Sequence, residues 1–204
     1  IFYICGDNAE KLARNPHLEG FRAKGVEVLL LTDTVDDFWP QAVEAFGGKI
    51  FKSVTRAGDE LGKVRDEAKK ENEAKPDAAG DIGALIALMK LTLGDQVKDV
   101  RASDRLTESA VCLVADEGDL DIHLERFLKQ HNQIKLPSKR ILEVNPTHPL
   151  IERMAAKAKQ DGAADQLKDV AYLLLDQARL MDGEALADPV EFGRRLGGIL
   201  KMAV

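Results

Sequence analysis

Cysteine is scarce in this sequence, and the scarcity argues against two classes of protein. The 204 residues include two cysteines, Cys5 and Cys112, which lie far apart in apolar runs typical of strands. Small domains stapled by disulfides, and zinc sites built from clustered cysteines, need more cysteines at closer spacing. We therefore expect a cytoplasmic protein that folds on its hydrophobic core and keeps two buried, reduced thiols.

Long apolar runs and a surplus of basic residues are also missing. No uninterrupted apolar stretch reaches the roughly 18 residues of a membrane span, and no signal segment opens the chain. The formal net charge of -6, with charges of both signs, argues against a nucleic-acid surface. The chain opens on an apolar, strand-like run without an initiator methionine, which predicts a piece of a longer protein.

Signatures of a catalytic or cofactor site are lacking too. The stretch GDELGKV (residues 58–64) has one residue too few between its glycines for a phosphate-binding loop. The histidines have no i, i+4 pair with a carboxylate between, and the acidic run at 116–121 lacks the ligand spacing of a calcium loop. No serine lies in a nucleophile elbow. We expect no catalysis, metal or cofactor within this chain.

The elements that are present predict an α+β protein whose first part is a small αβα three-layer unit. Its expected strands lie at 1–5, 26–31 and 49–54. A helix is expected over 35–46, where Thr34 and Asp37 have the spacing of a capping box. Pro40 falls just beyond the first turn of that helix, so it bends the helix or shifts its start.

A charged segment separates this unit from the rest of the chain. Residues 59–79 are rich in Lys, Glu, Asp and Ala, and such a segment buries little apolar surface. It is either an exposed helix or a linker, and in both cases a boundary falls near residue 76. We therefore divide the chain into domains at 1–75 and 76–204.

The second domain is predicted to mix short strands with helices and to end in helices. The expected strands lie at 97–101, 110–115 and 140–144, and the expected helices at 82–93, 118–130, 145–159, 165–181 and 189–202. Asn145 and Pro146 provide a cap and a first-turn proline for one helix, and Asp188 with Glu191 provides a capping box for the last. Residues 170–175 are apolar nearly all round, which indicates neighbours on several sides, including a partner chain.

The stretch GDLDIHLERFLKQ (residues 118–130) has the pattern of a short amphipathic helix. Its apolar stripe consists of Leu120, Leu124, Phe127 and Leu128. Ile122 falls on the opposite, charged side. Periodicity alone favours a stripe packed in the core, because most amphipathic helices bury their apolar face.

Several stretches in collinear order resemble one known family. They include GVEVLLLTD (25–33), FGGK (46–49), SDRL (103–106), LEVNPTHPL (142–150) and LLLDQA (173–178). The sequence is similar to the end of the middle domain and the C-terminal domain of heat-shock protein 90 chaperones, in their bacterial form. The resemblance implies an ATP-driven, dimeric chaperone of non-native proteins, whose ATP and Mg site lies in segments outside this chain.

The family resemblance also implies which residues form the homodimer. The family's dimer is a four-helix bundle of the last two helices of each protomer, which correspond here to 165–181 and 189–202. The implied interface residues are Leu174, Ala178, Phe192, Leu196, Ile199 and Leu200. Their alternative role is an ordinary core within one chain.

Client binding in the family is associated with the helix after the second strand of the middle-domain unit. It is also associated with an exposed amphipathic helix in the C-terminal domain, which corresponds here to residues 118–130. The implied client-binding residues are Phe38, Trp39, Gln41, Leu120, Leu124, Phe127 and Leu128. The pair Phe38 and Trp39 differs from the family's usual single aromatic, and leucine and phenylalanine replace its frequent methionines. Two alternatives stay open: a flavodoxin-like α/β enzyme domain with a helical dimerisation appendage, and a purely structural dimerisation module.

Overall fold

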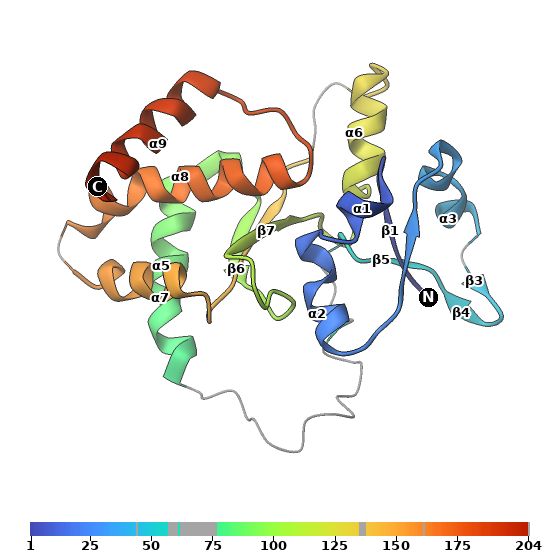
Figure 1. Ribbon diagram of the computed structural model, residues 1–204, viewed down its shortest axis with the longest axis horizontal. Coiled ribbons are helices and arrows are strands. Elements are labelled where there is room, and N and C mark those ends of the chain that lie inside the picture. The colour runs from blue at the N-terminus through green and yellow to red at the C-terminus, as the bar shows by residue number, and fades with distance from the viewer. Residues whose placement is uncertain (44, 57–60, 62–76, 135–137, 161, 204) are drawn as a thin grey trace.

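The computed structural model describes residues 1–43, 45–56, 61, 77–134, 138–160 and 162–203. The chain is a mixed α/β protein, as the α+β prediction requires, with a small sheet in each of two parts (Figure 1). We call residues 1–56 together with Leu61 the first unit, and residues 77–203 the second unit. The predicted boundary near residue 76 lies outside the described residues.

The first unit is built on a parallel three-stranded sheet in the order β2-β1-β5. Its strands are β1 (Phe2–Cys5), β2 (Val28–Leu31) and β5 (Lys52–Ser53). The helical segments are α1 (Ala9–Leu12), η1 (Pro16–Leu18), α2 (Glu19–Ala23), η2 (Thr34–Asp37) and α3 (Trp39–Ala42). The core of this unit comprises Ile4, Leu12, Leu18, Phe21, Val54 and Leu61.

Two predicted elements of the first unit are wrong in detail. The strand expected over 49–54 is divided, because β3 (Ala45–Phe46) and β4 (Lys49–Ile50) form an antiparallel hairpin before β5 begins. The long helix expected over 35–46 is replaced by the short η2 and α3. Pro40 lacks the backbone N–H that would continue η2 as an α-helix and fits only in the first turn of α3.

The second unit has a mixed three-stranded sheet in the order β6-β8-β7. The strands are β6 (Asp99–Ala102), β7 (Val111–Val114) and β8 (Ile141–Val144), with β8 parallel to β6 and antiparallel to β7. The helical segments are α5 (Asp77–Leu93), η3 (Gly94–Gln96), α6 (Ile122–Gln130), α7 (Pro149–Ala158), α8 (Ala163–Met181) and α9 (Pro189–Ala203).

The core of the second unit lies between its sheet and the helices α5, α7 and α8. Leu85 and Met89 of α5, Leu142 of β8, and Ile151 of α7 are all fully buried there. Helix α7 starts later than predicted: His148 is its N-cap, with a side chain that accepts a hydrogen bond from the backbone N–H of Leu150 at 3.1 Å. The helix begins at the second proline of the NPTHP run because the intervening residues form a turn.

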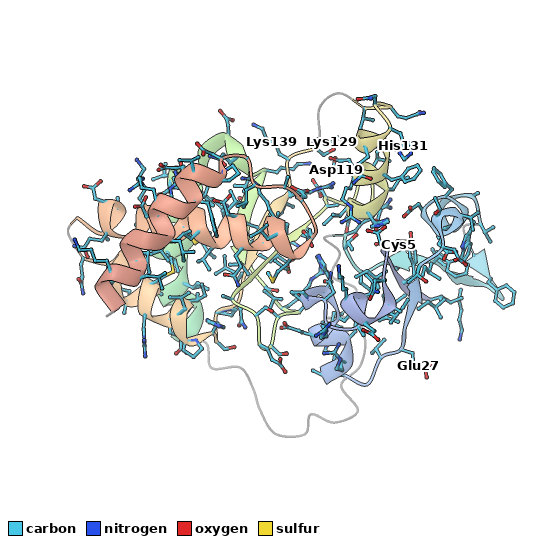
Figure 2. All side chains as sticks on the ribbon, turned by 45° about the horizontal axis from the view of Figure 1, so that its top comes forward. Cys5, Glu27, Asp119, Lys129, His131 and Lys139 are labelled. Carbon is cyan, nitrogen blue, oxygen red and sulfur yellow. The ribbon has the colours of Figure 1, made fainter. Side chains whose placement is uncertain are left out.

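The two units touch along a polar seam. Gly20 of α2 packs so closely on the second unit that an added Cβ would lie 2.6 Å from the carbonyl oxygen of Arg105. Backbone pairing also crosses the seam, since the N–H of Ala115 donates to the carbonyl oxygen of Thr55 at 2.9 Å. Both cysteines are free and buried, as predicted, and Cys5 lies where the first unit meets α6 (Figure 2).

Candidate functional site

The segment η2–α3 carries the first predicted site residues and is shaped by a capping box. The backbone N–H of Asp33 donates to Oδ2 of Asp36 at 3.0 Å, so the box lies one residue earlier than the Thr34–Asp37 pair predicted. This places Phe38 between η2 and α3. The short-turn geometry turns Phe38 and Trp39 in different directions.

Phe38 and Trp39 therefore have different environments. Nε1 of Trp39 donates to Oδ1 of Asp36 at 2.6 Å, and its ring packs edge-on against Phe51 with centroids 5.1 Å apart. Phe38 remains 44% exposed. Of the two aromatics, Phe38 faces solvent and Trp39 supports the fold. The side chain of Gln41, the third predicted residue here, lies outside the described part.

Helix α6 is attached to the first unit at its beginning. The N-cap Asp121 accepts a hydrogen bond from the backbone N–H of His123 at 2.9 Å through Oδ1. Its other oxygen accepts from the hydroxyl of Thr55 at 2.7 Å and from the hydroxyl of Ser53. One buried carboxylate thus caps the helix and fixes it to the end of β5.

Ion pairs hold the first turns of α6 against the first unit. Nδ1 of His123 lies 2.6 Å from Oδ1 of Asp37, its Nε2 lies 3.2 Å from Asp7, and Nη2 of Arg126 lies 2.7 Å from Asp7. Burial lowers the pKa of His123, but the hydrogen bond to Asp37 and the charges of Asp37 and Asp7 outweigh burial and Arg126, so the pKa is raised.

This raised pKa predicts a pH-dependent contact. Because the folded-state pKa lies above the unfolded value of about 6.5, protonated His123 stabilises the fold. This stabilisation is complete below about pH 6.5 and is lost as the pH rises through the folded-state pKa. We expect His123→Gln to remove this part of the pH dependence of thermal unfolding. An unchanged pH profile in the variant would show that His123 contributes nothing to it.

The apolar stripe of α6 is not an open surface along its whole length. Leu124 and Ile122 are each 5% exposed. Leu124, predicted to contact clients, therefore has almost no surface to offer a client in this conformation. Ile122, on the opposite side of the helix, is buried as well, so the start of α6 is covered on both sides. Leu120, Phe127 and Leu128 are half-buried.

The two stretches predicted to bind clients meet in space. The rings of Phe38 and Phe127 lie edge to face, with centroids 5.5 Å apart and an interplanar angle of 86°. The ring of His131 lies 4.2 Å from that of Phe127. We call Phe38, Phe127 and His131 the aromatic ridge. It joins η2–α3 and α6 into one surface, which sequence reasoning had treated as two.

Further apolar side chains, close to Phe38 in the sequence, are exposed on the first unit. They are Val35 (62% exposed), Val43 (45%), Phe46 (73%) and Ile50 (60%). Isolated apolar residues are common on protein surfaces, so these four residues do not by themselves define an interaction surface. The sequence signal for Phe46 and Ile50 was hidden, because the hairpin was expected to be one strand.

Helix α9 carries the second group of predicted site residues. Oδ1 of Asp188 accepts hydrogen bonds from the backbone N–H groups of Val190 (3.1 Å) and Glu191 (2.9 Å), so the predicted cap is confirmed. In Figure 1 the helix lies on the outside of the molecule over α8. Arg195 fastens it there, with its guanidinium 4.2 Å from the ring centroid of Tyr172.

The predicted interface residues divide into two groups. None of the described side chains of α9 is buried: Leu196 is 39% and Leu200 55% exposed, and Phe192 and Ile199 are half-buried. The other two residues are different. Leu174 and Ala178 are 3% and 1% exposed within the single chain, because they face the core between α8 and the sheet. In this conformation they have almost no surface to offer a partner.

Sequence reasoning missed the polar groups that join the units. The carboxylate of Glu19, 8% exposed, accepts hydrogen bonds from the backbone N–H groups of Thr107, Glu108 and Ser109. It also accepts from the hydroxyl of Ser109 at 2.5 Å. No spacing motif marks such a contact, because its partners are 88 to 90 residues away.

Metal-binding clusters and membrane-spanning helices are two further features that could define a function. Among the residues described, no group of three or more His, Cys, Asp or Glu side chains is arranged to hold a metal ion. No helix in the described ranges is long and apolar enough to cross a membrane.

Comparison with known proteins gives a consistent result. The family model described as "Hsp90 protein" matches residues 1–204. "Chaperone protein HtpG" of Roseobacter denitrificans is 54% identical over 206 residues, which cover 100% of this chain and 33% of that protein. The protein of the same name from Paramagnetospirillum magneticum is 50% identical, over 98% of this chain and 32% of its own length. The chain thus spans about a third of the curated relatives that it matches.

Proposed function

Because this chain belongs to the Hsp90 family, we propose that it is the dimerisation and client-binding part of a cytoplasmic molecular chaperone. In this proposal residues 1–75 end the middle domain as an αβα three-layer unit, and residues 76–204 form the C-terminal domain. The whole protein is an ATP-dependent chaperone, and its ATP and Mg site lies in the length of the relatives that this chain does not cover. This chain catalyses no reaction and binds no nucleic acid.

The exposed apolar face of α9 is the observation that carries the proposal. Helix α9 packs mainly on α8, and its residues Phe192, Leu196, Ile199 and Leu200 all lie outside the core, which leaves apolar area uncovered in the single chain. Pairing α8 and α9 of two protomers in a four-helix bundle would cover it. The proposed interface is therefore these four residues, without Leu174 and Ala178.

A charge on this face is expected to separate the protomers. Leu196→Glu would place an unpaired carboxylate in the proposed interface, which is strongly unfavourable. We expect its mass by light scattering at micromolar concentration to fall from that of two chains to that of one. Lys201→Glu, a change to an exposed residue five positions further on α9, is the control and should remain a dimer. Equal masses for the two variants would contradict the proposed interface.

The aromatic ridge is the proposed client-binding surface. Edge-to-face aromatic rings that remain partly exposed offer apolar area with little loss of side-chain entropy on binding. We expect Phe38→Ser combined with Phe127→Ser to weaken binding to an unfolded reporter protein several-fold while leaving the dimer mass unchanged.

The control for the ridge is Leu91→Ser, because Leu91 is an apolar residue of α5 that is 86% exposed. It should bind the reporter as the unmodified chain does. If the ridge variant bound equally well, or if it lost its fold, the ridge would be a packing feature and not a binding surface. The flavodoxin-like alternative is not supported by the family match, which extends over both units.

A further inference from the structure

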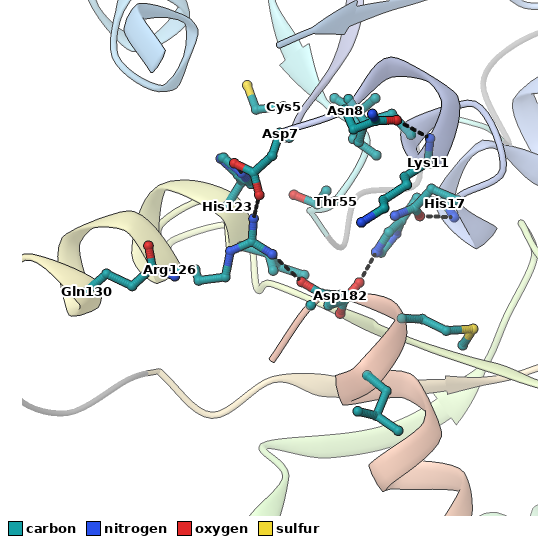
Figure 3. A pocket seen from close by; sticks show the side chains of 18 residues that line it. Cys5, Asp7, Asn8, Lys11, His17, Thr55, His123, Arg126, Gln130 and Asp182 are labelled. Atoms are coloured by element: carbon teal, nitrogen blue, oxygen red, sulfur yellow. Dashed lines mark hydrogen bonds and ion pairs between the residues drawn. The ribbon is translucent and has the colours of Figure 1, made fainter. Parts of the chain in front are cut away.

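A cavity of about 420 Å³ lies where the first unit, α6 and the end of α8 meet (Figure 3). Its size falls within the range of pockets that hold small molecules, about 300–1,000 Å³. It is separate from the aromatic ridge and from the exposed face of α9. Its apolar wall includes Ile4, Leu12, Ile122 and Leu180.

Two polar side chains at this cavity, His17 and Asp182, are buried and face each other as a long ion pair without a hydrogen bond (Figure 3). His17 is 1% exposed, and neither of its ring nitrogens has a hydrogen-bond partner in the part of the chain that the structure describes. Its Nε2 lies 3.6 Å from Oδ1 of Asp182, and Oδ2 of Asp182 also lacks a partner among the described residues. Buried polar groups in folded proteins are almost always satisfied. These groups therefore indicate a ligand that carries its own donor and acceptor.

The charges around the cavity specify the ligand further. Arg126 is already engaged by Asp7 and by the carbonyl oxygen of Asp182, at 2.7 and 2.8 Å. The ammonium group of Lys11, by contrast, has no ion pair among the described residues, and Figure 3 shows Lys11 pointing into the same hollow as His17. An available cation therefore lies on one side, and a carboxylate oxygen without a partner lies on the other.

The end of helix α8 adds to the preference of Asp182 for a positively charged group on the ligand. Its 19 residues end at Met181, next to Asp182, and both residues line the cavity. The carboxyl end of a helix carries partial negative charge and favours a cation nearby. A positive group on the ligand would therefore be stabilised by Asp182 and by the end of α8 together.

We propose that this cavity binds a free amino acid with an aliphatic side chain. The carboxylate of the ligand pairs with Lys11 and accepts a hydrogen bond from His17. Its ammonium group donates to Oδ2 of Asp182. The side chain of the ligand lies against the aliphatic wall of the cavity.

The test uses three matched probes on the 204-residue chain, followed by amide chemical shifts in NMR. L-leucine carries both charges, 4-methylpentanoate lacks the ammonium group, and 3-methylbutylamine lacks the carboxylate. We expect saturable shifts with L-leucine around His17 and Asp182, and roughly tenfold weaker binding of either single-charge analogue, because each leaves one buried group unpaired. No saturation with L-leucine, or equal binding of 4-methylpentanoate, would overturn the proposal.

Variants assign the two charges separately. Asp182→Asn should weaken the binding of L-leucine and should not weaken the binding of 4-methylpentanoate, which has no ammonium group to pair with Asp182. Lys11→Met should weaken the binding of both ligands. Lys168→Met, at an exposed residue of α8 that does not line the cavity, is the control and should bind L-leucine normally. If Asp182→Asn fails to fold, the comparison of the three probes on the unmodified chain still decides the outcome.

Discussion

Replacing Glu19 with Gln is expected to lower the free energy of unfolding by about 2–4 kcal/mol. Glu19 is nearly buried at the seam and accepts hydrogen bonds from four donor groups in a short loop of the second unit. Hydrogen bonds to a charged acceptor are stronger than neutral ones. The amide nitrogen of Gln would also face backbone N–H groups that need an acceptor.

Acid should weaken the same contact. Burial raises the pKa of Glu19, but the hydrogen bonds from Ser109, Glu108 and Thr107 outweigh it, so the folded pKa is lowered. Because the folded-state pKa lies below the unfolded value of about 4.3, the ionised carboxylate stabilises the fold. This stabilisation is complete above about pH 4.3 and is lost as the pH falls through the folded-state pKa. The Glu19→Gln variant should lack this acid-dependent loss.

Urea unfolding at neutral pH, followed by circular dichroism, measures the effect. Glu27→Gln is the matched control, because Glu27 is exposed and stands out from the first unit (Figure 2). Its stability should change by less than about 0.5 kcal/mol. If the Glu19 and Glu27 variants were equally stable, the loop at residues 107–109 would not depend on the carboxylate.

Replacing Arg105 with Met is expected to cost about 3–5 kcal/mol, because it leaves a buried carboxylate without its main counter-charge. The side chains of Arg105 and Glu143 are 4% and 1% exposed, with Nε of Arg105 3.0 Å from Oε2 of Glu143. The guanidinium also donates to the carbonyl oxygens of Val54 and Arg56, at 2.6 and 3.2 Å, so it joins the two units.

Arg101 is the control for this buried pair. It also binds Glu143, with 2.6 Å between Nη2 and Oε1, but its side chain is 39% exposed. Water can replace part of that interaction, so Arg101→Met should cost about 1 kcal/mol or less. Thermal or urea unfolding of the two variants distinguishes them. A similar cost for both would mean that burial does not determine the strength of the pair.

The sequence was a good guide where a single local rule decides the structure. Apolar runs located β1, β7 and β8 within a residue or two, and Asp188 marked the start of α9 as predicted. Local rules failed where proline competes with a helix. Pro40 divides the helix expected over 35–46, and Pro149 takes the first-turn role predicted for Pro146.

The candidate site was harder to predict, because it depends on contacts between distant residues. The stripe of α6 could be recognised from its period, but its partners could not. The contacts of Asp121 with Thr55 and of His123 with Asp37 decide that Leu124 is covered and Phe127 meets Phe38. Likewise, the pattern of α8 indicated burial on several sides, and the covering neighbours of Leu174 and Ala178 prove to lie within the same chain.

The mass of the unmodified chain in solution is the most direct test of the proposed dimer. Light scattering across a dilution series measures it without any substitution. We expect the mass of two chains at micromolar concentration, twice 22.4 kDa, because the proposed partner would cover the apolar face of α9. A mass of one chain at that concentration would contradict it.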